Sequence, residues 1–366
     1  MELDLFRNFY NGKRVLITGH TGFKGSWLAI WLYELGAEVI GISLEPYSSR
    51  DNFVLSGIKD KIIDLRGDIR DGKLLKDIFK QYQPEIVFHL AAQPLVRLSY
   101  DIPVETYEVN LMGSIHVMEA IRVTESVKVS VMITTDKCYE NRELIWEYHE
   151  NEPMGGYDPY SSSKGATEIA IASWRRSFFN PYTYSAHGKS IASVRAGNVI
   201  GGGDWSLDRI IPDCVKSLEA GKPVEIRSPK AIRPWQHVLE PLSGYLLLAL
   251  KMWDNPTKYC EGWNFGPHTD SIANVWDVAT KVVGNYYSLF GVRGHLVDLS
   301  DPNALYEAKL LMLDISKAKL QLGWEPRMNI DQSVKLTVDW YIRYKHENVY
   351  EICLEQIHKF IDNENY

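Results

Sequence analysis

Cysteine is scarce in this chain of 366 residues. The four cysteines, Cys138, Cys214, Cys260 and Cys353, lie far apart and form no CxxC pair. That spacing excludes a disulfide framework and a cysteine-based zinc site, and it indicates reduced thiols. We predict a protein without a metal centre.

Long hydrophobic runs are also missing. The longest one, around Tyr245 to Leu250, is far shorter than the roughly 20 residues that cross a bilayer. The first residues, Met1 to Lys13, mix polar and aromatic side chains and lack the apolar core of a signal peptide. These absences predict a cytoplasmic protein with no membrane segment.

The chain has no excess of positive charge. Its 40 lysines and arginines face 47 acidic residues, which gives a formal net charge of −7 and argues against nucleic acid as a partner. A local basic pocket for a phosphorylated small molecule remains compatible with this balance. The length suits one large domain or two unequal lobes of a soluble globular protein.

Short apolar runs alternate with helical patterns through the first half of the chain. The runs indicate buried strands at residues 15–18, 39–42, 86–89, 129–133 and 191–194. The helical patterns cover residues 23–35, 71–81, 104–123 and 160–178. This alternation predicts an α/β fold, a Rossmann-type doubly wound parallel sheet covered by helices on both faces.

The alternation ends near residue 195. Turn residues follow at Gly201 to Asp204 and at Gly266-Pro267. Further helical patterns cover residues 238–253, 274–283 and 332–346. We predict a sheet domain over residues 1–195 that carries the nucleotide and catalytic sites. Residues 196–366 are predicted to form a smaller mixed α/β lobe that binds mainly substrate, with some chain returning to the sheet.

A glycine-rich loop follows the first predicted strand, Arg14 to Thr18. Gly19, Gly22 and Gly25 recur every third residue before a helical pattern. Such glycines permit a tight turn and close approach of the backbone to a pyrophosphate at the positive end of the helix. Their place at the first strand–helix junction predicts a dinucleotide site.

The end of the second predicted strand distinguishes NAD from NADP. Ser43 stands where an acid often binds the ribose, Glu45 follows two residues later, and Arg50 is five residues further on. An acid without an adjacent arginine binds the ribose hydroxyls and repels the extra phosphate of NADP. We therefore predict NAD.

The segment from Thr134 to Lys164 carries the candidate catalytic groups. Tyr160 and Lys164 are four residues apart, one helical turn, so the ammonium can lower the pKa of the phenol. Asp136 and Lys137 follow the predicted strand 129–133 at the sheet edge where ligands bind. An acid and a base beside the pair predict a reaction with more than one proton transfer.

These motifs resemble the extended short-chain dehydrogenases, whose glycine loop has the GxxGxxG form. Thr135-Asp136-Lys137 resembles the Thr-Asp-Glu of nucleotide-sugar 4,6-dehydratases within that family. The lysine, the loop 19–27 and the segment 195–205 are similar to the branch that acts on CDP-glucose. The resemblance covers nearly the full length.

The resemblance implies residue roles. The implied NAD contacts are Gly19, His20, Thr21, Gly22, Phe23, Lys24, Gly25, Ser43, Glu45, Asp68, Ile69, Leu90, Ala91, Ala92, Gln93, Asn110, Thr134, Tyr160 and Lys164. The implied substrate contacts are Gln93, Ser99, Thr135, Asn198, Arg209, Arg233 and Tyr306. Asn198, Arg209 and Arg233 would bind the diphosphate.

The implied reaction has three stages. Tyr160 takes the proton from the sugar 4-hydroxyl, held by Thr135, while hydride leaves C4 for NAD. Asp136 then acts as the acid that expels the 6-hydroxyl, after the ketone has acidified the C5 proton. Hydride returns to C6 and gives a 4-keto-6-deoxy sugar, a precursor of deoxysugars in surface polysaccharide.

Lys137 replaces the glutamate that removes the C5 proton in the family. It could act as the base if neutral, a state that Lys164 would favour, or stay charged and stabilise the enolate. The sequence leaves both roles open. His20 is bulky for its loop position, and we expect it to crowd the pyrophosphate and weaken NAD retention.

Two other functions remain open. An epimerase or reductase of the same fold would not need Asp136 and Lys137, and a non-catalytic NAD-binding regulator would not need Tyr160 and Lys164. The helical patterns 104–123 and 160–178 resemble those that pair in family dimers, so a homodimer or homotetramer is expected.

Overall fold

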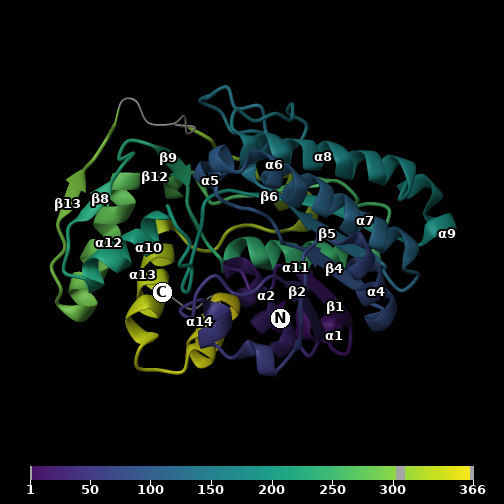
Figure 1. Ribbon diagram of the computed structural model, residues 1–366, viewed down its shortest axis with the longest axis horizontal. Coiled ribbons are helices and arrows are strands. Elements are labelled where there is room, and N and C mark those ends of the chain that lie inside the picture. The colour runs from purple at the N-terminus through teal and green to yellow at the C-terminus, as the bar shows by residue number, and fades with distance from the viewer. Residues whose placement is uncertain (1, 302–309, 363–366) are drawn as a thin grey trace.

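The computed structural model describes residues 2–301 and 310–362. Its centre is a seven-stranded sheet in the order β11-β6-β5-β4-β1-β2-β3 (Figure 1), and every pairing within it is parallel. The strands are β1 (Arg14–Thr18), β2 (Glu38–Ser43), β3 (Ile63–Arg66), β4 (Ile86–His89), β5 (Val129–Ile133), β6 (Ser190–Ala196) and β11 (Gly262–Phe265). The predicted doubly wound α/β sheet is confirmed.

Helices cover both faces of this sheet (Figure 1). One face carries α4 (Gly72–Tyr82), α7 (Ser114–Val123) and α8 (Pro159–Ser177). The other carries α1 (Glu2–Tyr10), α2 (Phe23–Glu34), α11 (Leu239–Asp254) and α14 (Val349–Asp362). Successive residues of β1 serve the two faces, because Val15 and Ile17 pack on the α2 side and Leu16 packs on the α4 side. A strand buried on both sides must be apolar throughout, which explains the continuous runs in the sequence.

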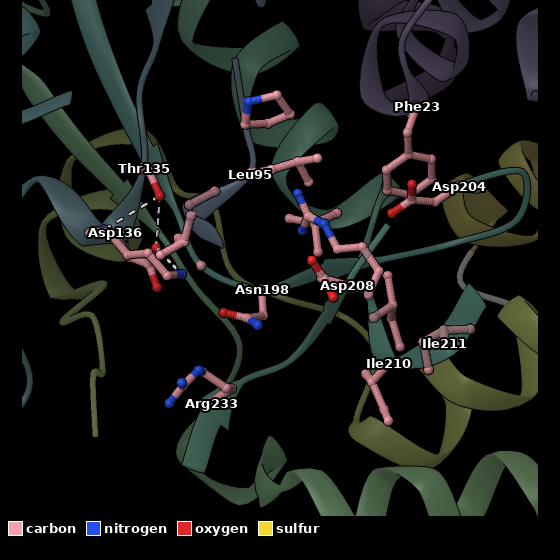
Figure 2. A pocket seen from close by; sticks show the side chains of 18 of the residues that line it. Phe23, Leu95, Thr135, Asp136, Asn198, Asp204, Asp208, Ile210, Ile211 and Arg233 are labelled. Atoms are coloured by element: carbon pink, nitrogen blue, oxygen red, sulfur yellow. Dashed lines mark hydrogen bonds and ion pairs between the residues drawn. The ribbon is translucent and has the colours of Figure 1, made fainter. Parts of the chain in front are cut away.

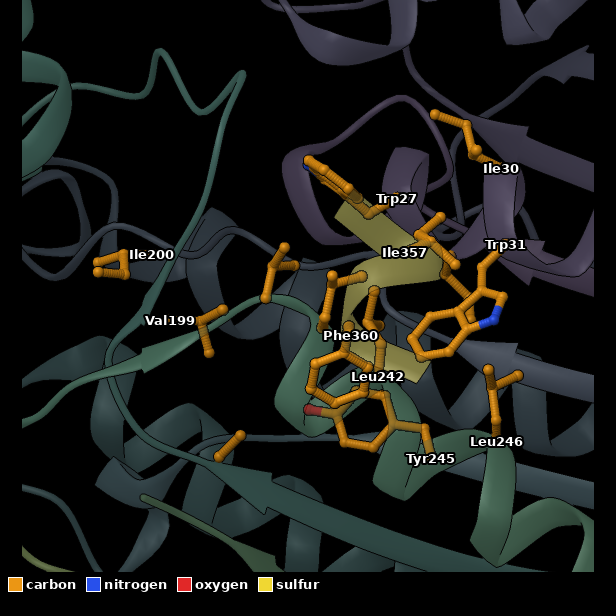
Figure 3. Close-up of a cluster of buried hydrophobic side chains, with 14 of the residues drawn as sticks. Trp27, Ile30, Trp31, Val199, Ile200, Leu242, Tyr245, Leu246, Ile357 and Phe360 are labelled. Atoms are coloured by element: carbon orange, nitrogen blue, oxygen red, sulfur yellow. The ribbon is translucent and has the colours of Figure 1, made fainter. Parts of the chain in front are cut away.

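The larger core joins segments from both ends of the chain (Figure 3). Trp27 and Trp31 of α2 lie beside Leu242 and Tyr245 of α11 and beside Phe360 of α14. The rings of Trp31 and Phe360 meet edge to face with centroids 5.9 Å apart. The C-terminal helices therefore complete the layer under the nucleotide half of the sheet.

One predicted helix is interrupted. Residues 104–123 form α6 (Pro103–Tyr107), a π-helical segment (Glu108–Gly113) and α7. The interruption contains Asn110, whose buried side chain reaches Gln93 of a neighbouring loop and Ser163 of α8. Such π segments are frequent at functional sites.

A second lobe lies beside the carboxyl ends of the strands (Figure 1). It contains three two-stranded pairs, β7 (Val199–Ile200) with β10 (Gln236–His237), β8 (Val224–Ile226) with β13 (Leu296–Asp298), and β9 (Ile232–Pro234) with β12 (Ile272–Asn274). Its helices are α10 (Ile210–Glu219) and α12 (Val275–Phe290).

Residues 196–366 do not belong to that lobe alone. β11 extends the sheet beside β6, α11 packs against β5 and β6, and α13 (Ile330–Arg343) leads into α14. The shorter helices are α3 (Asn52–Leu55), α5 (Val96–Asp101) and α9 (Tyr184–His187). Within the described ranges, no helix combines the length and the apolar character that crossing a membrane requires.

Three consecutive glycines connect the two parts of the molecule. A Cβ atom on Gly201 would lie 3.0 Å from the ring of Phe23, and one on Gly202 would lie 2.0 Å from the ring of Trp340. Gly203 has φ +77° and packs against Asn52. Residues 201–203 are thus the point where the cofactor loop, helix α13 and helix α3 meet. Side chains at these positions would force the three elements apart.

Candidate active site

A cavity of about 270 Å³ opens at the carboxyl edge of the sheet. The sheet domain contributes Thr135, Asp136, Lys137, Tyr160 and Lys164 to its wall. The second lobe contributes Arg209, together with Asn198 and Arg233, which Figure 2 labels. The structure therefore brings together all five residues predicted to be catalytic, from segments more than twenty positions apart in the sequence.

Thr135, Asp136 and Lys137 follow directly after β5. Thr135 caps a short 3-10 turn, Asp136–Cys138, and its hydroxyl donates to Asp136 Oδ1 at 2.9 Å. Lys137 Nζ lies 3.4 Å from the same oxygen. Asp136 is fully buried, and its Oδ2 atom has no hydrogen-bond partner among the described residues. A buried carboxyl oxygen without a partner can carry a proton for transfer.

Tyr160 and Lys164 lie on the first turns of α8. The helix begins at Asp158, whose carboxylate accepts hydrogen bonds from the Ser161 amide at 2.9 Å and the Ser161 hydroxyl at 2.6 Å. The Tyr160 amide donates to Ser99 Oγ at 3.1 Å. Lys164 Nζ lies 3.5 Å from the carbonyl oxygen of Ile133 at the end of β5. The cap therefore fixes where α8 begins, and this start places the side chains of Tyr160 and Lys164 on the helix face near the strand ends.

Burial is the largest influence on both groups. It raises the pKa of Tyr160 to about 12, against a hydrogen bond with Thr135 and the charge of Arg209, which lower it. Burial likewise lowers the pKa of Lys164 to about 8, against the charge of Glu168. The sequence predicts that the Lys164 ammonium can lower the Tyr160 pKa; in the structure burial is the largest influence on that pKa and outweighs the groups that lower it.

A buried ion pair lies next to the candidate pair Tyr160 and Lys164. Glu168 lies one turn after Lys164, and its carboxylate accepts from Arg195 at 2.8 Å and from Ser193 at 2.7 Å. Thr134 donates to its other oxygen. Burial alone would raise the pKa of Glu168, but Arg195 and these hydrogen bonds outweigh it and lower that pKa. The sequence analysis did not identify this pair, although its acid continues the four-residue spacing of Tyr160 and Lys164.

The glycine loop is packed too tightly for side chains. A Cβ on Gly25 would lie 2.1 Å from the carbonyl oxygen of Gly19, and a Cβ on Gly19 would lie 2.7 Å from the amide nitrogen of Ala91. Gly19 also has φ +80°, which favours glycine. Helix α2 begins at Phe23 with no side-chain cap, so its first amides are available to an anion.

Beside the end of β2 lies one residue, Arg66 of β3, that was not predicted from the sequence. Ser43 is held by Thr21 through a 2.7 Å hydrogen bond between their hydroxyls, and exposed Glu45 pairs with Arg66 of β3 at 3.1 Å. Arg66 lies 21 positions after Glu45, so only strand pairing brings it to this edge. An arginine is therefore adjacent in space to Glu45, although it pairs with acids here.

His20 does not occupy the loop face that we expected. Its side chain is fully buried, and its ring lies edge to face against Phe53 and directly over Gly41. Its Nε2 atom lies 2.6 Å from Asp64 Oδ1. A ring without solvent exposure cannot crowd a ligand, so the predicted crowding of the pyrophosphate is wrong. His20 instead connects the glycine loop to β2, where it packs on Gly41, and to β3, where it bonds Asp64.

Three polar residues predicted to contact ligands bind the chain itself. Ser99 is fully buried and supports the start of α8, and the Gln93 side chain bonds Thr106 and the Leu95 backbone. Asn110 accepts from the Gln93 amide at 2.9 Å. The structure places these side chains outside the cavity wall, where they shape the loop after β4.

The remaining predicted contacts are distributed around the same edge. Leu90 and Ala92 line the cavity after β4, with Phe23 and Lys24 from the glycine loop. Asp68 pairs with Arg70 at 2.6 Å, and Ile69 is buried against Gly113. Tyr306 lies outside the described residues. No cluster of His, Cys, Asp or Glu suited to a metal ion occurs in the described part of the chain.

Comparison with known proteins agrees with this geometry. The family model described as GDP-mannose 4,6 dehydratase matches residues 16–337. The chain belongs to that family. A CDP-glucose 4,6-dehydratase of Salmonella typhimurium is 50% identical over 335 residues, which are 92% of each chain. A dTDP-glucose 4,6-dehydratase of Xanthomonas campestris is 24% identical and covers 89% of this chain and 92% of its own.

Solved structures of this family and of related epimerases share the fold. A dTDP-glucose 4,6-dehydratase from Streptomyces venezuelae with NAD bound has a TM-score of 0.75 and 20% identity, and covers 92% of this chain and 99% of its own. A UDP-glucose 4-epimerase from Thermus thermophilus with NAD gives a TM-score of 0.75 at 24% identity, with 90% and 99% covered. The fold therefore serves both dehydration and epimerisation, and the site residues must distinguish them.

Proposed function

We propose that this chain is an NAD-dependent CDP-glucose 4,6-dehydratase, a carbon–oxygen lyase that converts CDP-glucose to CDP-4-keto-6-deoxyglucose. The observation that carries this proposal is the position of Asp136 and Lys137 in the same cavity as Tyr160 and Lys164. An epimerase needs only the redox pair, whereas elimination of water needs a further acid and base. The 50% identity to the Salmonella typhimurium enzyme supports cytidine as the base.

The residues present fit a dinucleotide. Gly19 and Gly25 leave no room for a Cβ, the first amides of α2 have no side-chain cap, and Ser43 and Glu45 end β2. We assign the pyrophosphate to those amides and the adenosine ribose to the end of β2. NAD held there would accept hydride from the substrate and return it, so that no net oxidation occurs.

Tyr160 and Thr135 would handle the 4-hydroxyl of the sugar. A hydrogen bond joins them, and both line the cavity. A phenol whose pKa burial raises to about 12 needs a cation to release its proton near neutral pH. The charge of Arg209 lowers that pKa, and Lys164 follows one turn later on α8. Tyr160 would then take the hydroxyl proton while Thr135 holds the same oxygen.

Asp136 and Lys137 would then carry out the elimination across C5 and C6. The unpaired, buried Oδ2 of Asp136 is the atom suited to deliver a proton to the departing 6-hydroxyl. Lys137 is partly exposed and adjoins the same carboxylate at 3.4 Å. Two roles remain for it: as a neutral amine that takes the C5 proton, or as a charge that stabilises the enolate oxygen while another base or water takes that proton.

One assay tests the proposal against its rivals. The purified protein with CDP-glucose and NAD should form a product whose 4-keto group absorbs in alkali, without net accumulation of NADH. An epimerase would return CDP-galactose or another stereoisomer and no keto absorbance, and a reductase would consume added NADH. Nucleotide binding without any product would reject an enzymatic function, and product from UDP-glucose but not CDP-glucose would reject the cytidine preference.

The partner and location proposals rest on surface features. Apolar side chains are exposed along α6, the π segment and α8 at Val104, Met112 and Ile169. Helices with unpartnered apolar faces suit a homodimer, which could pair again into a homotetramer. We also propose that the enzyme is cytoplasmic and that its product enters deoxysugar synthesis for surface polysaccharide such as lipopolysaccharide O-antigen. Sedimentation of the purified protein at micromolar concentration tests the assembly.

A further inference from the structure

Lys24 is the second residue of α2, in the loop that we assign to the cofactor, yet its side chain lines the substrate cavity. Its ammonium forms no hydrogen bond or ion pair with any residue that the structure describes. The same is true of the guanidinium of Arg209, which enters the cavity from the second lobe. Half-burying a lysine without a partner costs free energy, because the ammonium loses hydration and gains no hydrogen bond or ion pair.

The charges around Lys24 make its surroundings strongly positive. Three cations, Arg209, Lys164 and Lys137, act on it, and Asp136 is the carboxylate among the strongest influences. Asp136 already receives Thr135 and Lys137 on Oδ1. Burial, followed by Arg209 and Lys164, lowers the pKa of Lys24 to about 8. The cavity wall carries seven lysines and arginines against five acids, and two of those acids, Asp208 and Asp213, pair with Arg227. The remaining excess of positive charge favours an anion from solution.

Two anionic groups are available in the proposed reaction. The cofactor pyrophosphate is satisfied by the first backbone amides of α2. Lys24 instead lines the same cavity as Asp136, Lys164 and Arg209, and the charges of these three groups act on its ammonium. Asn198 and Arg233, also from the second lobe, line the same space. Side chains from both lobes would therefore contact a substrate diphosphate that is bound between them.

We propose that Lys24 and Arg209 together bind the diphosphate of the nucleotide sugar, one from each lobe; this rests on the proposed function. Lys24 thereby becomes a substrate-binding residue contributed by the cofactor loop. On binding, the two phosphate groups would each provide an anionic partner for Lys24 and Arg209. Charge-assisted hydrogen bonds are stronger in such a partly buried site than in water.

Lys24→Met tests the proposal, because it keeps the length of the side chain and removes its charge. We expect the Kd of inorganic pyrophosphate, titrated into the NAD-saturated protein, and the KM for CDP-glucose each to rise about tenfold. The kcat and the Kd of NAD should stay within about twofold of the wild-type values, since one interaction of this size is lost only from substrate binding. Lys24→Arg should restore both affected constants, and Lys222→Met, which changes an exposed lysine of the second lobe, should alter neither.

Several outcomes would overturn the proposal. A weaker NAD affinity with an unchanged KM would place Lys24 on the cofactor, and a lower kcat with an unchanged KM would place it in the chemical steps. Failure of NAD-saturated wild-type protein to bind pyrophosphate would also reject it. If Lys24→Met melts well below the wild type, Lys24→Gln provides the same measurements. Absence of keto product from the wild type rejects the proposed function instead, because the pyrophosphate titration does not depend on turnover.

Discussion

The Thr135 hydroxyl donates a hydrogen bond to Asp136 Oδ1 at 2.9 Å, which fixes the orientation of a fully buried carboxyl group. The second oxygen of that group has no hydrogen-bond partner among the described residues, and a Cβ on Gly197 would lie only 3.3 Å from it. In the proposed mechanism Thr135 would connect two steps, since the same hydroxyl acts on Tyr160, the proposed base of the oxidation, and on Asp136, the proposed acid of the elimination.

Asp136→Asn should separate those two steps. The amide keeps the hydrogen bond from Thr135 but cannot deliver an acid proton to the leaving hydroxyl. We expect formation of the 6-deoxy product to fall by about 10²–10⁴-fold. Rapid-quench product analysis and NADH absorbance in a single turnover measure the two steps. NADH formation should persist in the variant, and full product formation at the wild-type rate would exclude Asp136 as the acid.

Lys137 variants should distinguish its two possible roles. Lys137→Ala removes both the amine and the charge, so exchange of the C5 hydrogen with deuterated solvent should fall at least about tenfold. Lys137→Arg keeps the charge but cannot become neutral at these pH values. Exchange that survives in Lys137→Arg assigns electrostatic stabilisation, and exchange lost in both variants assigns the base. A native exchange rate in Lys137→Ala would remove Lys137 from this step.

Gly25→Ala should damage the nucleotide loop more than Gly22→Ala. The new Cβ at position 25 would overlap the Gly19 carbonyl at 2.1 Å, whereas the one at position 22 would lie 3.3 Å from the same oxygen. We expect NAD affinity to fall at least about tenfold in Gly25→Ala, with a lower Tm. NAD titration by tryptophan fluorescence and thermal melting measure both. Equal effects of the two substitutions would mean that this packing does not support the cofactor.

The free energy of unfolding should decrease as the pH rises, because Glu240 loses a proton in the folded chain. Glu240 is completely buried in α11, and burial raises its pKa to about 8, against hydrogen bonds from the Arg327 and Met328 amides. The folded chain therefore binds a proton that the unfolded chain releases above its ordinary pKa, near 4.5. This contribution to stability is complete below about pH 4.5 and is lost as the pH rises through about 8.

Glu240→Gln removes that titration and keeps a carbonyl acceptor for the two amides. The Tm of the wild type should fall relative to that of the variant between pH 5 and 8, by on the order of 2–4 °C. Differential scanning calorimetry at several pH values measures the difference. Parallel Tm profiles for the two proteins would show that Glu240 does not titrate in this range. Glu355, a half-exposed acid of α14, provides a matched control in Glu355→Gln.

The sequence was sufficient for the strands that are buried on both faces. β1, β2, β4, β5 and β6 were predicted because such strands must be apolar at nearly every position. β3 was missed because it is partly exposed and alternates apolar and charged residues. β11 was missed because it is short and begins with glycine, and because its polar Asn264 is compensated by bonds to Tyr148 and Asp314, far away in the chain.

The residues of the candidate site also fall into two groups: those whose place the sequence predicts and those whose partners it does not reveal. Thr135, Asp136, Lys137, Tyr160 and Lys164 line one cavity, as predicted, because a strand end and a helical turn fix where they lie. Gln93, Ser99 and Asn110 were assigned to ligands because they are polar and near the site, whereas their partners lie in other loops and helices. His20 was misjudged for the same reason, since Asp64 follows it by 44 positions. A local pattern shows which residues approach a site, but only the fold shows which partners they already have.

The glycines at 201–203 have a consequence for engineering. Phe23, Asn52 and Trp340 converge on them from the start, the first quarter and the end of the chain. A boundary drawn at residue 195 would separate Phe23 and Asn52 from these glycines, and only the contact with Trp340 would remain within one fragment. We infer that this polypeptide cannot be divided into a portable cofactor module and an exchangeable sugar module. Changes of substrate preference must be made by replacing side chains within the intact enzyme.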